Sequence, residues 1–467
     1  MSTVTLSQRE LKRRRKLGAE YVAPSPYTLK AALEKGDIFT KLSALVFGLG
    51  NIVHKQYVKG LLFLAGEVGF ILFMIFSGAH NLSMLPSLGW RKESTEWVGA
   101  KLVHTPGDNS VTILLYGVCT LVICLLFLLW WSLAIRSAYK AQCLGGKNGR
   151  APSFMDDIHT LFDAKANILL LALPVAGILI FTVLPLIFMI SMAFTSYDHN
   201  HLVLFDWVGL QNFKAVFSNS GSIVSGRLFL SVLTWTLIWA FFATFLNFFF
   251  GLFLAMIIQR ATTRGKGFWR AVFSMSIAVP QFVSLLVMHQ MLQPQGAVNR
   301  ILESWGWING PMPFFTDTMW ARVTVIVINL WVGIPYTIMQ VTGILQNIPA
   351  ELYEAAKIDG ANWWQIFVKI TMPYIIFVLT PYLITTFTAN VNNFNVIYLL
   401  TRGDPIPVGD SAGKTDLLIT WLYKLTVDRS DYNSGAVIGI MTFIVLAIVS
   451  LITYRSSGSY KNEEAFR

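Results

Sequence analysis

Residues 351–373 read ELYEAAKIDGANWWQIFVKITMP and are the most specific stretch of the sequence. The pattern predicts a short helix, a break at Gly360, and a second helix that runs into a membrane span at Pro373. The first helix carries small alanines, which let the backbone of another protein approach closely, and acidic side chains, which offer hydrogen-bond acceptors. Because a helix this short is unstable alone, we expect it to dock on a partner through Glu354, Ala355, Ala356, Asp359 and Gly360.

The chain around this stretch is too apolar for a soluble domain. Hydrophobic residues make up 54% of its 467 residues and charged residues only 13%, so much of the chain must face lipid. A bilayer core about 30 Å thick needs about 20 apolar residues per helix, and lipid offers the backbone no hydrogen-bond partners. We therefore predict an all-α polytopic membrane protein with about eight transmembrane helices, at 57–77, 111–136, 168–195, 230–258, 270–293, 320–346, 374–400 and 433–454.

The predicted spans divide the chain into three parts. Residues 1–56 form a basic cytoplasmic tail with an interfacial or re-entrant helix at 38–54, residues 57–160 hold two spans and a cytoplasmic loop, and residues 165–467 hold a six-helix core. Several predicted helices contain proline, which frees a carbonyl and favours burial against partners or around a cavity. These prolines are Pro174, Pro185, Pro280, Pro335 and Pro381.

Lysine and arginine gather in alternate connecting segments. They occupy the two tails and the loops 137–167, 259–269 and 347–373. With eight spans these segments fall on one side, so both termini are predicted to be cytoplasmic. The net charge of +11 then reports orientation and contact with anionic lipid. Nucleic acid is not expected as a partner, since no basic recognition helix or aromatic RNA-binding motif accompanies the charge.

Ionisable residues are nearly absent from the predicted spans, and Glu67 is the clear exception. An acid inside a membrane is by default a functional candidate. Here a structural role is favoured, because the six-helix core does not need that span for a pathway. Proton-coupled carriers usually use such groups as relays, so this class is disfavoured, whereas sodium sites built from carbonyls stay open.

The sequence shows no metal or catalytic site. The three cysteines are scattered and suggest neither a disulfide framework nor a metal pair. The run Asp198-His199-Asn200-His201 can be read as a weak metal site, but a polar loop outside a span is the better interpretation. A membrane enzyme would need paired carboxylates, and the adjacent Asp156 and Asp157 are more typical of a solvated face.

Uncharged polar residues occupy the spans instead. Asn390, Asn392, Asn393 and Asn395 lie within six positions, more than inter-helix packing requires. An asparagine amide donates and accepts at once, which suits hydroxyl groups, and aromatic rings such as Tyr336 could cover the C–H faces of sugars. The lining fits a neutral polyol better than an ion.

The stretch at 351–373 resembles the EAA motif of ABC importer permeases. That motif is Glu-Ala-Ala, three residues, Gly, nine residues, then Ile-x-Leu-Pro, and it is matched here by Glu354-Ala355-Ala356, Gly360, Ile370 and Pro373, with Met372 in place of leucine. The change conserves volume. The resemblance implies the type I permease fold and a coupling helix that sits in a groove of a separate ATPase subunit.

Residues 388–426 further resemble the larger permease subunit of maltose and maltodextrin importers, above all at Ala412–Leu418. The resemblance covers about 165–467 and implies a sugar site midway through the membrane. Gly333 would then let a sugar ring approach the backbone. The matching positions are Gln281, Asn329, Val332, Gly333, Tyr336, Ala389, Asn390 and Asn393, of which Gln281, Val332 and Ala389 depart from the residues expected there.

The loop at 197–229 is short where the best-known members carry a large external domain. This form resembles that of single-membrane bacteria, and it implies an extracellular sugar-binding lipoprotein, a second homologous permease subunit and an ATPase dimer as partners, within membrane lipid. The run at 409–415 looks like a phosphate loop, but it has three residues between its glycines where that motif needs four. We therefore expect no nucleotide site, no cofactor and no metal in this chain.

The function expected from these features is that of a permease subunit for maltose and maltodextrins, with no enzymatic activity of its own. It would form half of the pathway and couple to ATP hydrolysis through the loop at 351–373. Two alternatives stay open: a permease for another oligosaccharide, and a self-contained secondary carrier, for which the bare spans offer little support.

Overall fold

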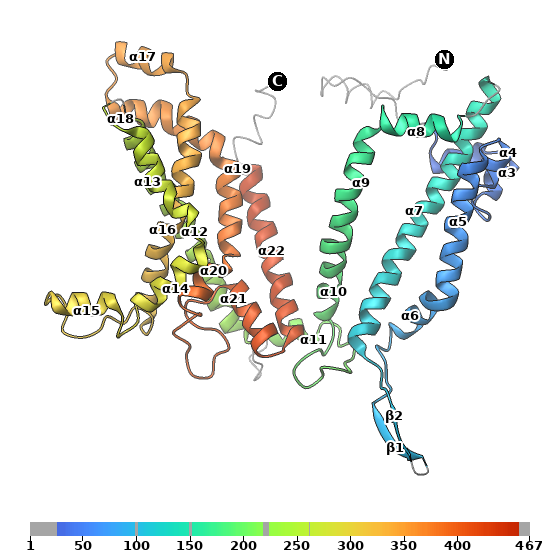
Figure 1. The fold of residues 1–467 in the computed structure, drawn as a ribbon, viewed down its shortest axis with the longest axis horizontal. Helices are drawn as coiled ribbons and strands as arrows, with labels where there is room; N and C mark the ends of the chain where they lie inside the picture. Colours follow the sequence, from blue (N-terminus) through green and yellow to red (C-terminus); the bar gives the residue numbers. More distant parts are fainter. Residues whose placement is uncertain (1–25, 99–100, 149–151, 218–223, 261, 457–467) are drawn as a thin grey trace. The chain divides into compact units, whose positions relative to one another are not determined.

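The computed structural model describes residues 26–98, 101–148, 152–217, 224–260 and 262–456 (Figure 1). The basic residues predicted to orient the N-terminal tail, and Lys461 and Arg467 in the C-terminal tail, lie outside these ranges. The chain forms two compact units, Met1–Phe188 and Met189–Arg467. The three-part division at 1–56, 57–160 and 165–467 stays a prediction.

The first unit is built on long apolar helices. Phe127 of α7 stacks on Phe70 of α5 with ring centroids 3.7 Å apart, and on Phe47 at 5.2 Å. Its elements are α2 (Leu29–Lys35), α3 (Ile38–Leu42), α4 (Leu49–Val53), α5 (Tyr57–Phe73), the π-helical turn η1 (Met74–Gly78), α6 (Ala79–Met84), β1 (Ser94–Val98), β2 (Lys101–Thr105), α7 (Ser110–Asn148), α8 (Phe154–Phe162), α9 (Ala166–Ile178), the π-helical turn η2 (Leu179–Val183) and α10 (Leu184–Met192), which crosses the unit boundary.

The ambiguous segment at 38–54 forms two short helices, α3 and α4, rather than one. Glu67 lies in α5, and its Oε2 accepts a hydrogen bond from the Phe47 amide, in the loop between α3 and α4, at 2.8 Å. The intramembrane carboxylate therefore satisfies a backbone donor that lipid would leave without a partner. This contact agrees with the structural role favoured for Glu67.

A β-hairpin interrupts the first unit between α6 and α7. β1 and β2 pair antiparallel, with Ser94 opposite Thr105 and Val98 opposite Lys101. These strands were not predicted, because each is only five residues long. The other elements of the described chain are helical, so the all-α prediction is confirmed with the hairpin as an addition.

The second unit packs its helices around three apolar clusters. Trp239 of α12 and Trp421 of α21 are its largest fully buried side chains. Its elements are α11 (Gln211–Phe217), α12 (Gly226–Gln259), α13 (Lys266–Ala278), α14 (Gln281–Met291), α15 (Ala297–Ser304), α16 (Thr318–Gln346), α17 (Ala350–Ile358), α18 (Trp363–Ile366), the π-helical turn η3 (Phe367–Thr371), α19 (Met372–Val391), α20 (Phe394–Leu400), α21 (Leu418–Tyr423), the π-helical turn η4 (Lys424–Asp428) and α22 (Tyr432–Ser456).

Seven helical stretches in the described residues are long and apolar enough to cross a membrane, and an eighth is the bent pair α13–α14. The prediction of about eight spans is therefore confirmed. Proline explains the exception. Pro280 was expected inside a helix, but it lies at a break where the chain bends by 83°, since Val279 is extended and proline lacks an amide hydrogen.

The second unit presents different connections at its two ends (Figure 1). At one end α17 and α18 join α16 to α19. At the opposite end lie α15, α21 and the segment 401–417 that follows α20. These two ends hold the features described next.

Candidate functional site

The helix α17 ends in a tightly specified turn at Gly360. The Gly360 amide donates to Lys357 O at 3.1 Å, and the Ala361 amide donates to Ala356 O at 2.9 Å. This pair of bonds is the Schellman arrangement, which needs a left-handed residue directly after the helix cap. Gly360 supplies it with φ +75°. The predicted break at Gly360 is therefore present and has a definite physical cause.

The chain after Gly360 restarts at once as a helix. Asn362 and Gln365 cap each other's backbone amides at 2.8 and 2.9 Å. From Trp363 the helix continues through η3 into α19, as one stretch that reaches Leu400. The predicted second helix that runs into a span at Pro373 is confirmed.

The coupling residues predicted on α17 are open to solvent. Glu354, Ala355, Asp359 and Gly360 are exposed and Ala356 is half-buried. Beside them Ile358 is 85% exposed, an unusual position for a large apolar side chain on a helix of nine residues. Figure 1 shows α17 standing clear of the long helices of its unit. This face is thus accessible, apolar at its centre and bordered by carboxylates.

A side-chain contact holds α17 over the start of the next span. Tyr353 Oη and Thr371 Oγ1 lie 3.2 Å apart, and Thr371 is buried within η3. The contact therefore links α17 to the helix that continues as α19.

The residues predicted to contact sugar lie on three helices and in two kinds of environment. Asn329 and Asn390 are buried, whereas Tyr336 and Ala389 are exposed. Gln281, Val332, Gly333 and Asn393 are intermediate, and Val332 packs against an apolar cluster. Gln281 is the first residue of α14. The α16 helix carries Asn329, Val332, Gly333 and Tyr336. Ala389 and Asn390 lie at the end of α19, and Asn393 precedes α20.

The asparagine cluster coincides with a break in the seventh span. α19 ends at Val391, and Asn393 caps α20 by accepting the Val396 amide at 3.3 Å. Asn390 is tied to α12, since its Nδ2 donates to Thr244 Oγ1 at 3.0 Å and its carbonyl accepts from Trp239 Nε1 at 3.0 Å. In this conformation Asn393 therefore caps the helix after the break, and Asn390 joins the end of α19 to α12.

Gly333 lies at a close approach between α16 and α12. A Cβ atom at this position would come within 2.2 Å of Asn247 Nδ2, so glycine allows the two helices to pack, as small residues commonly do in membranes. Nearby, Asn329 Nδ2 and Asn247 Oδ1 are buried without a hydrogen-bond partner among the described residues. The α12–α16 contact thus leaves no room for a side chain at position 333, and it contains a buried amide donor and a buried amide acceptor that make no hydrogen bond among the described residues.

A buried polar network at the other end of the unit was not anticipated. Asp416 accepts from Lys424 Nζ at 2.6 Å, from the Gly413 amide at 2.7 Å and from Thr420 Oγ1 at 2.9 Å. Burial raises the pKa of the Asp416 carboxyl, while Lys424 and the two other donors act in the opposite direction. The eight-residue spacing of Asp416 and Lys424 gave no motif signal, although only the short helix α21, which η4 continues at Lys424, separates the two residues.

The same segment is fastened onto two long helices. Trp235 Nε1 of α12 donates to Thr415 O at 3.1 Å, and Arg322 Nε of α16 donates to Lys414 O at 3.1 Å. The Arg322 guanidinium also lies 4.5 Å from the centre of the Trp235 ring, a cation–π arrangement. The run Ala412–Leu418, on which much of the sequence resemblance rests, is therefore a packing element.

The histidines near 200 pair with separate carboxylates. His199 Nδ1 lies 3.0 Å from Asp431 Oδ1, and His201 Nδ1 lies 2.8 Å from Asp198 Oδ1. Among the described residues, no group of three or more His, Cys, Asp or Glu side chains is placed to hold a metal ion. The pairs connect the loop after α10 to itself and to the start of α22.

The chain is similar to known transport proteins over most of its length. Residues 247–458 match the family described as binding-protein-dependent transport system inner membrane component. The galactooligosaccharides transport system permease protein GanP of Bacillus subtilis (strain 168) is 33% identical, over 90% of this chain and 98% of GanP. The maltodextrin transport system permease protein MdxF of the same organism is 35% identical, over 91% of this chain and 96% of MdxF.

Two further similarities cover a smaller share of the chain. The maltose/maltodextrin transport system permease protein MalF of Vibrio vulnificus (strain YJ016) is 34% identical, but over 53% of this chain and 48% of MalF. This contrast agrees with the short-loop form inferred from residues 197–229. A chain in the crystal structure of a bacterial ABC transporter involved in the import of the acidic polysaccharide alginate shares the fold, with a TM-score of 0.53 at 23% identity over 63% of this chain and 96% of that one.

One assignment is supported by the near full-length similarity to GanP and MdxF, by up to eight candidate spans, and by the short helix with its glycine turn. The chain belongs to the family of inner membrane components of binding-protein-dependent transport systems, and within it to the larger permease type.

Proposed function

We propose that this chain imports maltose and maltodextrins as the larger permease subunit of an ATP-driven ABC transporter, and that it forms half of the translocation pathway. The observation that carries the proposal is α17, whose exposed alanines, carboxylates and Ile358 form a docking face without a partner in its own unit. Similarity to maltodextrin permeases over more than nine-tenths of the chain supports the substrate.

The proposed role of α17 is mechanical coupling. ATP binds to and is hydrolysed by a separate ATPase dimer, and closure of that dimer pushes the Glu354–Gly360 segment. Tyr353 and Thr371 transmit the push into η3 and α19. On this proposal the chain performs no covalent chemistry, has no nucleotide site and needs no cofactor of its own. In the run that looks like a phosphate loop, Lys414 instead lies 3.8 Å from Asp410.

The proposed assembly has four kinds of partner besides lipid. They are a second homologous permease subunit, the ATPase dimer, an extracellular sugar-binding lipoprotein, and the sugar itself. Both termini and α17 would face the cytoplasm, which follows the positive-inside pattern. The segment 401–431, at the opposite end of the unit from α17, would then face the binding protein.

The sugar would contact residues near the middle of α16 and the break between α19 and α20. Tyr336 and Ala389 are exposed in the single chain and suit a pathway shared with a second subunit. Gln281 on α14 and Val332 and Gly333 on α16 would complete the contacts. Asn329, Asn390 and Asn393 offer amides for hydroxyl groups, and Asn329 Nδ2 is a buried donor with no partner in the described residues. Movement between α12 and α16 would be needed to present that donor.

A second candidate substrate class is supported by GanP, a galactooligosaccharide permease that is as similar to this chain as the MalC maltodextrin permease of Streptococcus pneumoniae, each at 33% identity. Both classes are neutral oligosaccharides. Both would use the same amide and aromatic lining, so the geometry does not favour one over the other.

Uptake of labelled maltotriose, of a galactooligosaccharide and of an unrelated disaccharide tests the proposal, in cells with and without this chain. We expect deletion to abolish maltotriose uptake selectively. Selective loss of galactooligosaccharide uptake would reject the maltodextrin assignment in favour of the second class. Transport by this chain alone in ATP-free vesicles would contradict the ABC mechanism and favour a secondary carrier.

A further inference from the structure

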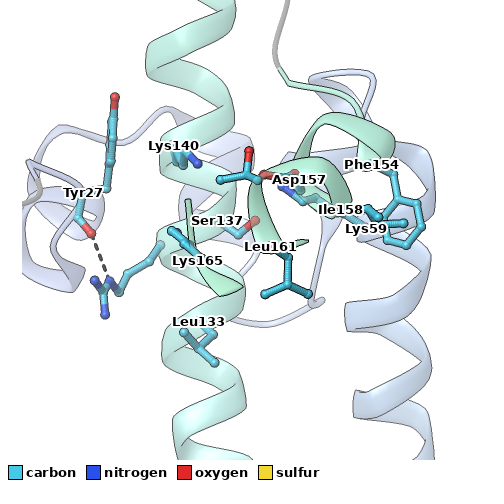
Figure 2. Close-up of a pocket in the computed structure, with 12 residues that line it drawn as sticks. Tyr27, Lys59, Leu133, Ser137, Lys140, Phe154, Asp157, Ile158, Leu161 and Lys165 are labelled. Atoms are coloured by element: carbon cyan, nitrogen blue, oxygen red, sulfur yellow. Dashed lines mark hydrogen bonds and ion pairs between the residues drawn. The ribbon is translucent and has the colours of Figure 1, made fainter. Parts of the chain in front are cut away.

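The first unit contains a basic cavity that the proposed transport role does not use. Its volume is about 680 Å³, and it lies among α7, α8, Lys59 of α5 and Lys165 just before α9 (Figure 2). A cavity of this size can hold a small ligand or a lipid headgroup. The Gln56 side chain donates to Pro152 O at 2.6 Å and joins the start of α5 to the segment before α8.

Positive charge dominates the lining. The lining contains four cationic side chains and one carboxylate, Asp157, and one of the cations, Arg136, also donates from Nε to Tyr27 O at 3.0 Å. The other three cations are Lys59, Lys140 and Lys165. Asp157 forms an ion pair with Lys59, which leaves three cations unmatched by an acid of the lining. Lys140 lies within electrostatic range of Lys59, Lys165 and Asp157. Clustered like charges repel, so the arrangement is better satisfied with an anion present.

Part of the cavity lining is apolar. Leu133, Phe154, Ile158 and Leu161 form this part. In Figure 2 Leu133 and Leu161 lie toward one end of α7 and Lys140 toward the other. Seven residues of helix separate Leu133 from Lys140, about 10 Å at the rise of an α-helix. The α7 helix continues through Leu133 into its membrane span, so the apolar end points toward the bilayer core.

The neighbouring helix α8 suits the bilayer surface. Ser153 and Asp156 form a capping box that fixes its start, and Phe154, Ile158 and Leu161 recur at helical spacing on the side that lines the cavity. Elsewhere on α8, Met155 is 59% and Phe162 67% exposed. An amphipathic helix beside a span end is typical of the headgroup region.

We propose that this cavity binds the phosphate group of an anionic phospholipid, with the headgroup at Lys140, Lys165 and Arg136 and an acyl chain along Leu133 and Leu161. Basic pockets between transmembrane helices are suited to phospholipid headgroups. A free phosphate ion would satisfy the cations but would leave the apolar part of the lining unused. The lipid matches both parts.

Native mass spectrometry of the purified full-length chain tests the proposal, by titration with phosphatidylglycerol, phosphatidylcholine and inorganic phosphate. We expect wild-type protein to retain phosphatidylglycerol about tenfold more tightly than phosphatidylcholine, a preference that Lys140→Gln with Lys165→Gln removes. The matched control is Lys30→Gln with Lys35→Gln, which removes the same charge from α2 outside the cavity and should keep the preference.

Three outcomes would overturn the proposal: equal retention of the two lipids by wild type, an equal loss in the control pair, or displacement of phosphatidylglycerol by equimolar inorganic phosphate, which would assign the site to free phosphate. Photo-crosslinking with a diazirine-bearing phosphatidylglycerol needs no variant, so it tests the site even if the double variant does not fold. Crosslinks should fall on residues 133–165, and labelling confined to other segments would reject the site.

Discussion

The connections after α16 and after α20 lie at opposite ends of the unit 189–467 (Figure 1). They differ in whether their charged and apolar side chains are buried or exposed. After α20, Asp416 and Lys424 are buried and matched, and Trp235 and Arg322 clamp the backbone. After α16, α17 leaves Glu354 and Asp359 in solvent, and Ile358 is 85% exposed.

The comparison separates a segment that is complete within the chain from one that is not. The Asp416 segment has its partners within its own unit, so its effect should be on folding. The nine-residue helix α17 has no buried residue and exposes its apolar centre, so its stabilising partner is expected in another protein. Changes in α17 should therefore affect coupling and leave the folding of this chain intact.

Removal of the Asp416 carboxylate should have the largest effect. Asp416→Ala leaves the buried Lys424 ammonium without its partner, which typically costs about 3–5 kcal/mol. We expect a sharp fall in monodisperse protein and in melting temperature, measured in detergent. The control is Asp410→Ala, which breaks a surface pair with Lys414 worth about 0–1 kcal/mol. Similar melting temperatures for the two variants would show that the network does not hold the segment.

Substitution at Gly360 should separate transport from folding. Gly360→Ala forces a Cβ atom into the left-handed region at φ +75°, which costs about 1–2 kcal/mol. We expect ATP-driven uptake to fall about tenfold at unchanged abundance, because a Cβ atom at this position would meet no described heavy atom within 4 Å beyond the adjacent residues. Gly343→Ala is the control, as its Cβ would also meet open space but at an ordinary helical φ. Wild-type uptake by Gly360→Ala would remove α17 from the coupling route.

The same two ends show what the sequence can reveal. The break at Gly360 was predictable because its chemistry is local: the glycine that ends α17 and the Asn362–Gln365 cap that starts α18 lie within six residues. The Asp416 network was missed because the segment that carries it is held by contacts with α12 and α16, more than ninety residues earlier. Sequence resemblance marked the segment at Ala412–Leu418 without revealing its role.

Prolines and asparagines show the limit inside the membrane. Pro174, Pro335 and Pro381 lie within helices, as predicted, whereas Pro280 breaks one. The difference lies in the backbone at Val279 and in what packs around it, neither of which hydropathy reports. Asn390 and Gly333 were predicted as sugar contacts, and in this conformation they also anchor and pack α12. Their contact with sugar stays a prediction.

Loss of the Tyr353 hydroxyl should have a smaller effect than the glycine change. Tyr353→Phe removes the contact with Thr371 Oγ1, worth about 1 kcal/mol. We expect hydrogen exchange of the α17 amides to become about fivefold faster, with little change in melting temperature. Thr371→Val should give the same acceleration, and the double variant should add little to either. Additive effects would mean that the two side chains act separately.

The smallest effect should be a pH dependence at the His199–Asp431 pair. The hydrogen bond to Asp431 raises the pKa of His199 above its ordinary 6.5, helped by the charges of Asp431 and Asp198. A raised folded pKa stabilises the protein fully below pH 6.5 and loses that contribution as pH rises through the folded value.

The melting temperature of wild type should therefore exceed that of His199→Gln at acidic pH and converge with it at alkaline pH. The margin should be slight, because half of the imidazole is exposed and solvent screens the pair. Asp431→Asn should remove the same pH-dependent difference, since it takes away the charge that raises the pKa. A difference that grows with pH would contradict the assignment. Such a trend would mean that folding lowers the pKa of His199, whereas a difference that stays constant with pH would reduce the pair to an uncharged hydrogen bond.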